Sequence, residues 1–190
     1  MLCTGNRCRS PIAEALLRHR LDQLGVEARV SSAGELPGGV PAERGSVRVM
    51  AARGLDLGRH SSRAFTAEHL ERADLVLCMA RRHVREAVLL HTDAWPRTFT
   101  LKELVRRGEA RGPRRPDQTL DEWLAEVHQG RRTTDLLGED ALDDVEDPIG
   151  APDHVYEDTA AELEDLIDRL VGLAFAPAAR TSDPVPTKES

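Results

Sequence analysis

The segment that most constrains this chain is Cys3–Pro11, which reads CTGNRCRSP and runs directly into an amphipathic stretch. Ser10 is a favourable N-cap residue and Pro11 suits the first helical position, so the sequence predicts a helix that continues until Gly25. A short glycine-containing loop at a helix N-terminus brings several backbone N–H groups to one point. Because such loops follow strands in open α/β sheets, we expect this loop at the carboxyl end of a first strand.

The remainder of the chain alternates between strand-like and helix-like segments. Short apolar or β-branched runs predict strands at Ala28–Ser31, Ala73–Met79 and Thr98–Thr100. Helical patterns are found at Pro41–Arg53, at Arg81–Leu90, after a capping box at Thr119 and Glu122, and at Tyr156–Leu170. Residues 106–118 and Asp143–Pro152 read as loops.

This alternation, in a chain of 190 residues, predicts one α/β domain over residues 1–175. We expect a central parallel sheet of about four strands with helices on both faces. The first strand is nearly absent, because only Met1 and Leu2 precede Cys3. We therefore expect the natural chain to begin upstream with about four to six further apolar residues. Residues 176–190 are expected to form a disordered tail.

Composition excludes several classes of function. The formal net charge of −7 argues against a nucleic-acid partner. No apolar run approaches the ~18 residues that a membrane span needs, and the N-terminus lacks a signal-peptide layout. The three cysteines are too few for a secreted disulfide scaffold, so we expect a cytoplasmic protein. Residues 1–20 nevertheless carry four arginines and one carboxylate, which suits a small anion or an anionic side chain as ligand.

The residues of the first loop themselves indicate phosphate chemistry. Backbone N–H groups of Thr4, Gly5, Asn6, Arg7 and Cys8 can converge on an oxyanion, and the planar guanidinium of Arg9 can hold two of its oxygens. The same positive field favours the thiolate of Cys3, which makes it a candidate nucleophile, and Ser10 can donate a hydrogen bond to it. A zinc site is not expected, because no second Cys/His pair stands at ligand spacing.

With these residues the sequence resembles the low-molecular-weight protein tyrosine phosphatase family, whose loop reads C-x-G-N-x-C-R-S-P. Further matching segments are Ser32-Ala33-Gly34, Gly54-Leu55-Asp56, His60-Ser61-Ser62-Arg63, Ala73–Met79, and Asp147-Pro148-x-Gly150 followed by Tyr156. The resemblance implies a phosphatase that acts on phosphorylated proteins, releases inorganic phosphate, and uses neither metal nor cofactor.

The resemblance also assigns roles to single residues. Cys3 would attack phosphorus, Arg9 would bind the phosphoryl oxygens, and Asp147 would act first as general acid and then as general base. Polar residues that would hold the loop in shape are Asn6, Ser10, Ser32 and His60. Cys8 would be the redox partner that forms a reversible disulfide with Cys3. From the residues alone, Asp147 could equally belong to a solvated acidic turn.

Some positions leave the substrate open. Where aromatic side chains would line a phosphotyrosine pocket, only Leu36 and Ile149 offer apolar walls. Arg7 is a second arginine at the mouth, which could favour acidic substrates or point to solvent. Phosphotyrosine is the first expectation and phosphoarginine the alternative. An arsenate reductase, which would need further cysteines, and an inactive truncated product are two remaining alternatives, and the longer segment 106–140 has no assigned role.

Overall fold

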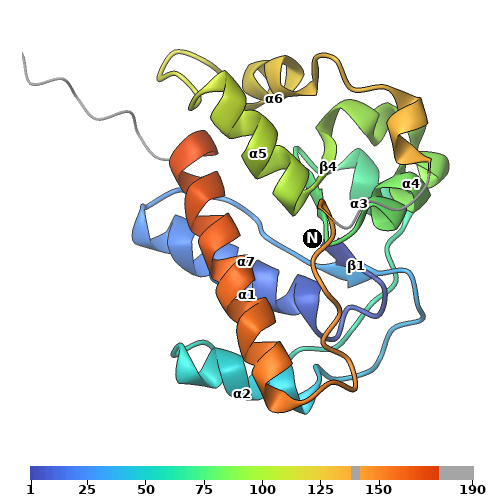
Figure 1. Ribbon diagram of the computed structural model, residues 1–190, viewed down its shortest axis with the longest axis vertical. Coiled ribbons are helices and arrows are strands. Elements are labelled where there is room, and N and C mark those ends of the chain that lie inside the picture. The colour runs from blue at the N-terminus through green and yellow to red at the C-terminus, as the bar shows by residue number, and fades with distance from the viewer. Residues whose placement is uncertain (138–141, 176–190) are drawn as a thin grey trace, which may run out of the picture.

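The computed structural model describes residues 1–137 and 142–175, which form a four-stranded parallel sheet in the order β2-β1-β3-β4. The strands are short: β1 is Leu2–Cys3, β2 is Ala33–Gly34, β3 is Val76–Cys78 and β4 is Thr98–Thr100. β1 is central, because it pairs in parallel with both β2 and β3 (Figure 1). The predicted fold class, a parallel α/β sheet with the first loop leaving the central strand, is therefore confirmed.

The predicted strand at Ala28–Ser31 is wrong. The second strand begins at Ala33, two residues after the predicted strand ends, because Leu2 and Cys3 of β1 stand opposite Ala33 and Gly34. Before Ala33, the Ser31 carbonyl accepts a hydrogen bond from the Met1 amino group (2.8 Å), but Ser31 is not part of the strand. A partner strand, and not the local apolar pattern, decides which residues form β2.

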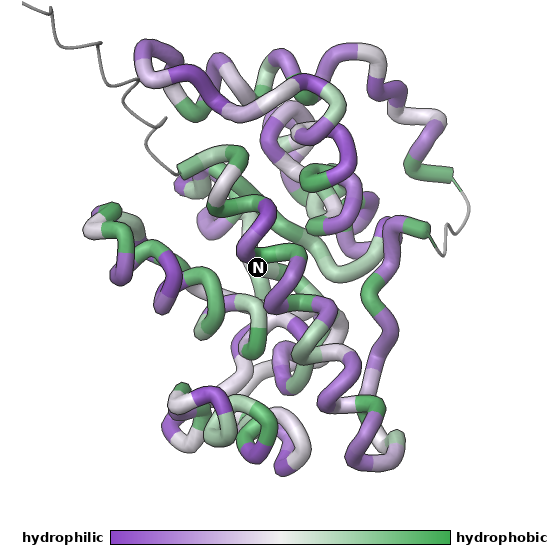
Figure 2. Tube along the Cα trace, turned by 60° about the vertical axis from the view of Figure 1, so that its left-hand side comes forward, coloured by the Kyte–Doolittle hydropathy of each residue, from purple (hydrophilic) through white to green (hydrophobic). Residues whose placement is uncertain are grey.

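One face of the sheet is covered by five helices. These are α1 (Arg9–Gln23), α2 (Arg44–Ala52), α5 (Leu101–Arg111), α6 (Leu120–His128) and α7 (Asp153–Ala174). The long helix α7 packs against α1, α2 and α5, and Figure 1 shows it running across this layer. Hydrophobic residues recur along the helices between hydrophilic ones, as expected of helices with one buried stripe (Figure 2).

The other face is covered by α3 (Ala67–Glu71), α4 (Arg81–Leu90) and two 3-10 helices, η1 (Thr92–Arg97) and η2 (Thr133–Leu136). Successive residues of β3 enter opposite cores: Leu77 belongs to the core under α1 and α7, whereas Val76 and Cys78 belong to the core under α4. This alternation is expected of a strand covered on both sides. Burial raises the pKa of the Cys78 thiol, which agrees with its expected place in the core.

Helix boundaries differ from the sequence-based expectations at two places. The predicted loop 106–118 is shorter, because α5 continues to Arg111 and ends at Gly112, whose φ is +92°. Within this stretch Gly108 lets α5 approach Trp123, since a Cβ there would lie 3.0 Å from the indole ring. Helix α2 begins at Arg44 and not at Pro41, which instead pairs with Ser61.

Other expectations are confirmed or lie outside the description. The Thr119–Glu122 capping box starts α6, and residues 143–152 form neither helix nor strand. No helix among the described residues is long and apolar enough to cross a membrane. The expected disordered tail and part of the 106–140 segment fall on residues outside the described ranges, so the domain boundary at 175 stays a prediction.

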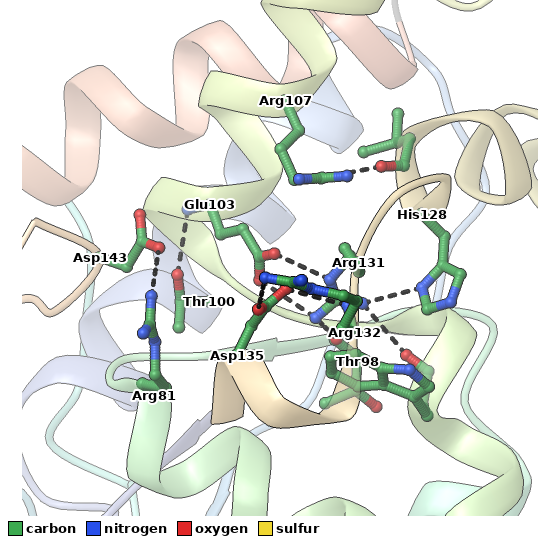
Figure 3. A network of polar contacts seen from close by, with 12 residues as sticks. Arg81, Thr98, Thr100, Glu103, Arg107, His128, Arg131, Arg132, Asp135 and Asp143 are labelled. Atoms are coloured by element: carbon green, nitrogen blue, oxygen red, sulfur yellow. Dashed lines mark hydrogen bonds and ion pairs between the residues drawn. The ribbon is translucent and has the colours of Figure 1, made fainter. Parts of the chain in front are cut away.

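A buried arginine joins the segment after α6 to the edge of the sheet (Figure 3). The Arg131 guanidinium lies 3.7 Å from the Trp95 ring centroid and 4.0 Å from that of Phe99. It donates to both carboxylate oxygens of Glu103 (2.8 and 3.1 Å) and to the carbonyl of Thr98 (2.8 Å). Its side chain is 2% exposed, so this ion pair is enclosed. The contacts fix strand β4 against α5 and the chain that follows α6.

Replacing Arg131 with Met should lower the free energy of unfolding by about 3–5 kcal/mol, because Glu103 then keeps a largely buried charge without its cation. For a domain of this size, that corresponds to a fall in Tm of roughly 6–20 °C. The matched control is Arg132→Met, whose side chain is 78% exposed and pairs with Asp135 at the surface. Thermal melting of both variants tests the prediction, and equal Tm values would contradict it.

Candidate active site

The loop after β1 leads into α1 through a residue with unusual backbone geometry. Helix α1 begins at Arg9 with Cys8 as its N-cap, so Ser10 lies inside the first turn and is not the N-cap that the sequence suggests. Asn6 has φ of 51°, the left-handed region that a short polar side chain can occupy. This reversal turns the backbone from the end of the strand toward the start of the helix.

All four predicted loop-supporting residues meet at this point. The Asn6 amide donates to the hydroxyls of Ser10 (3.0 Å) and Ser32 (2.8 Å). Its amide oxygen accepts from the Arg63 backbone N–H (3.0 Å). His60 Nε2 lies 2.7 Å from the Asn6 carbonyl oxygen. The loop is therefore held by residues from α1, from the end of β2 and from the segment around His60.

Cys3 lies at the centre of this loop. Its Sγ accepts from the Asn6 backbone N–H (3.3 Å) and lies 2.9 Å from Ser10 Oγ. The sulfur thus lies beside a backbone N–H group and a hydroxyl, next to the N-terminus of α1. Cys3, the candidate nucleophile, therefore lies at the carboxyl end of the central strand.

Cys8 differs from Cys3 in its surroundings although both belong to one loop. Burial raises the pKa of the Cys8 thiol to about 12, so it is a neutral thiol near pH 7. Cys3 and Cys8 are free cysteines in the structure. The disulfide between them stays a prediction, and the raised pKa of Cys8 would slow its attack on an oxidised Cys3, because the thiolate is the attacking form.

Arg9 connects the loop to the segment that carries Asp147. Its guanidinium donates to the Val145 carbonyl (3.0 Å) and to Thr4 Oγ1 (3.3 Å), and it forms an ion pair with Asp147. The Arg9 side chain is buried, whereas that of Asp147 is 35% exposed. The structure therefore brings Asp147 to Arg9 beside the Cys3 loop, although Asp147 is distant in sequence.

Two residues of the site were not predicted from the sequence. Arg82 donates to Thr4 Oγ1, and His83 Nε2 lies 3.2 Å from the same oxygen. Burial, and after it the positive charges of Arg9 and Arg82, lowers the pKa of His83 to about 3, so this imidazole is neutral. Both residues stand in the first turn of α4, directly after the buried strand β3. That position, at the carboxyl end of a parallel strand, is the only signal that could have indicated them.

The mouth of the loop is lined by charged and aliphatic side chains. Arg7 forms an ion pair with Glu43, the N-cap of α2, and does not extend freely into solvent. The Glu35 backbone N–H donates to the Thr4 carbonyl (2.8 Å), and burial raises the pKa of the Glu35 carboxyl. Leu36 and Ile149 are 52% and 49% exposed.

The loop that carries Asp147, residues 143–152, contains no aromatic residue. Tyr156 is buried against Gly45, where a Cβ would lie 2.6 Å from the ring. Among the described residues, no group of three His, Cys, Asp or Glu side chains could hold a metal ion.

Comparisons with known proteins agree with this geometry. Residues 1–130 match the family described as low molecular weight phosphotyrosine protein phosphatase. A protein-arginine-phosphatase of Geobacillus stearothermophilus is 34% identical over 171 residues, 89% of this chain and 90% of that protein. The low molecular weight protein-tyrosine-phosphatase Etp of Escherichia coli (strain K12) is 37% identical over 126 residues, 65% of this chain and 82% of that protein.

Solved structures extend the likeness over most of the chain. The crystal structure of a low molecular weight protein tyrosine phosphatase from T. tengcongensis superposes with a TM-score of 0.68 at 34% identity, covering 90% of this chain and 94% of that one. The YwlE arginine phosphatase from Geobacillus stearothermophilus gives a TM-score of 0.63 at 34% identity, covering 89% and 86%. The chain belongs to the low molecular weight phosphotyrosine protein phosphatase family.

Proposed function

We propose that this phosphatase hydrolyses phosphotyrosine in proteins through a cysteinyl-phosphate intermediate. The observation that carries the proposal is the meeting of three groups at one loop: the Cys3 thiol, the Arg9 guanidinium and the Asp147 carboxylate. A nucleophile, an oxyanion-binding cation and a proton donor are the three groups that phosphoryl transfer to a thiolate requires.

In the first step the Cys3 thiolate attacks phosphorus, so an S–P bond forms as the P–O bond to the tyrosine breaks. Arg9 and the loop N–H groups stabilise the charge on the phosphoryl oxygens. When the phosphoryl oxygens bind the Arg9 guanidinium, they displace the Asp147 carboxyl from its ion pair, and this carboxyl can then face the leaving oxygen. Asp147 then gives its proton to the departing phenolate oxygen.

In the second step the Asp147 carboxylate takes a proton from a water molecule, whose oxygen attacks phosphorus. The S–P bond breaks, inorganic phosphate leaves, and the Cys3 thiolate is restored.

We further propose that the protein acts in the cytoplasm, because its nucleophile must remain reduced.

Replacing Cys3 with Ser should abolish turnover of aryl phosphates while binding of inorganic phosphate is retained. A hydroxyl fits the same space, but it is far less readily ionised by this loop than a thiol. Steady-state rates with p-nitrophenyl phosphate and isothermal titration with inorganic phosphate give the two measurements. Turnover by the Ser variant would contradict the assignment of the nucleophile.

Replacing Asp147 with Ala should lower kcat for phenyl phosphate by about 10²–10⁴-fold, the usual contribution of a general acid. The loss should be much smaller for 2,4-dinitrophenyl phosphate, because its leaving group departs without a proton. A ratio of kcat values measured for the two substrates isolates proton transfer. Equal losses for both would mean that Asp147 does not act as the acid.

Phosphoarginine in proteins is a second candidate substrate. Three carboxylates adjoin the loop, those of Glu35, Glu43 and Asp147, and they would attract the positive charge of a departing guanidinium. A phenol ring gains most from aromatic neighbours, and the exposed apolar side chains here are aliphatic. The similarity to the protein-arginine-phosphatase of Geobacillus stearothermophilus supports the same alternative.

Initial rates with one peptide carrying either phosphotyrosine or phosphoarginine separate the two candidates. We expect faster hydrolysis of phosphotyrosine, and we expect Glu43→Gln to lower that rate less than the rate with phosphoarginine, because phenol carries no charge for Glu43 to attract. Faster hydrolysis of phosphoarginine, together with a loss of that rate in Glu43→Gln, would instead establish the arginine activity.

A further inference from the structure

The segment before Asp147 is attached to the protein by a buried carboxylate. The Asp143 side chain is 3% exposed, and its two oxygens accept hydrogen bonds from Arg106 Nη2 (3.0 and 3.1 Å). One of these oxygens also accepts from Arg81 Nη2 (3.2 Å), a contact drawn in Figure 3. Asp143 thereby joins α4, which contributes Arg81, to α5, which contributes Arg106.

The next two residues are tied to the same place. The Arg81 backbone N–H donates to Asp144 Oδ1 (2.7 Å), and Lys102 Nζ donates to the Asp144 carbonyl (2.7 Å). The Val145 N–H donates to the Met79 carbonyl (2.8 Å), directly after β3. Three consecutive residues, Asp143–Val145, are therefore fixed to the carboxyl end of the sheet.

This attachment lies between the sheet and the proposed acid. The Val145 carbonyl accepts from Arg9 Nη1 (3.0 Å), and Asp147 follows only two residues later. Beyond Asp147 the chain makes a turn, closed by the Ala151 N–H on the Pro148 carbonyl (2.9 Å), before α7 begins at Asp153. The attachment at Asp143–Val145 thus sets where the Asp147 carboxyl lies relative to the Cys3 loop.

We propose that Asp143 is a positioning residue for proton transfer by Asp147. The inference rests on the proposed role of Asp147 as general acid, and it assigns Asp143 no contact with substrate. Two cations on one buried carboxylate hold the segment at a fixed distance from the end of β3, the edge from which the phosphate loop also departs. Proton transfer depends on placement within hydrogen-bond reach, and a misplacement of about 1 Å can lower a rate about 10²-fold.

The test is the kcat of Asp143→Ala and Asp143→Asn in the full chain with two substrates. For Asp143→Ala, kcat with phenyl phosphate should fall about tenfold or more, and kcat with 2,4-dinitrophenyl phosphate less than about threefold. KM should change by less than about twofold for both, because the Cys3 loop keeps its contacts with Ser10, Ser32 and His60, none of which involves the segment of Asp143. Asn retains an oxygen that can accept from one arginine, so Asp143→Asn should recover part of the phenyl phosphate rate.

The double variant Asp143→Ala/Asp147→Ala distinguishes positioning from a general structural effect. If Asp143 acts through Asp147, the double variant should turn over phenyl phosphate as fast as Asp147→Ala alone. Arg106→Ala removes a side chain that is 61% exposed and leaves Arg81 in place, so it gives a second, milder perturbation with the same expected pattern. Asp165→Ala, which removes an exposed partner of Arg169 on α7, is the control and should leave both rates unchanged.

The outcomes separate the two proposals. The positioning role would be overturned if Asp143→Ala and Arg106→Ala lost equal rate with the two substrates. It would also be overturned if Asp143→Ala caused a further loss of rate in the Asp147→Ala background. In both cases the acid role of Asp147 stands, provided that Asp147→Ala loses more rate with phenyl phosphate than with 2,4-dinitrophenyl phosphate. If Asp147→Ala itself shows no such difference, both the acid and its positioning residue are refuted.

Discussion

The site depends on a single backbone reversal at Asn6, because it lets the chain leave the central strand and enter α1 with the Asn6 N–H group directed at the Cys3 sulfur. A non-glycine residue in the left-handed region costs roughly 1–2 kcal/mol. Three hydrogen bonds of the Asn6 side chain, each worth about 0.5–1.5 kcal/mol net, offset this. A short side chain with both a donor and an acceptor meets these demands, which explains asparagine at this position; His60 adds a contact to its main-chain carbonyl.

The Cys3 loop and the segment that carries Asp147 are both attached to the carboxyl edge of the sheet. The nucleophile leaves this edge at the end of β1, and the segment bearing Asp147 is fixed beside the neighbouring strand at Met79. Arg9 spans the two by donating to Val145 across 136 positions of sequence. Because β1 and β3 are adjacent and parallel, groups at their carboxyl ends are near each other without any long connecting arm.

The local parts of this arrangement could be predicted from sequence and the non-local parts could not. The loop string Cys3–Pro11 specifies its own turn and helix, so its expected residues are found together. The sequence did not indicate Arg82, His83 and Asp143, because the partners of these polar residues lie 37 to 79 positions away. Ala28–Ser31 looked more strand-like than Ala33–Gly34, yet pairing with β1 decided the register. Residues 106–111 looked like a loop, yet Gly108 allows close packing on Trp123.

The charges around the site explain how an acidic protein can bind a phosphate group. Carboxylates adjoin the loop, but each is weakened as a source of negative charge: Asp147 is paired with Arg9, Glu43 with Arg7, and burial raises the pKa of Glu35. Arg9 and Arg82 both reach Thr4, and a neutral His83 beneath them adds no charge of its own. An incoming phosphate therefore meets guanidinium groups whose present partners it can replace. Since Asp147 is one of those partners, binding of the phosphate and release of the proposed acid are the same event.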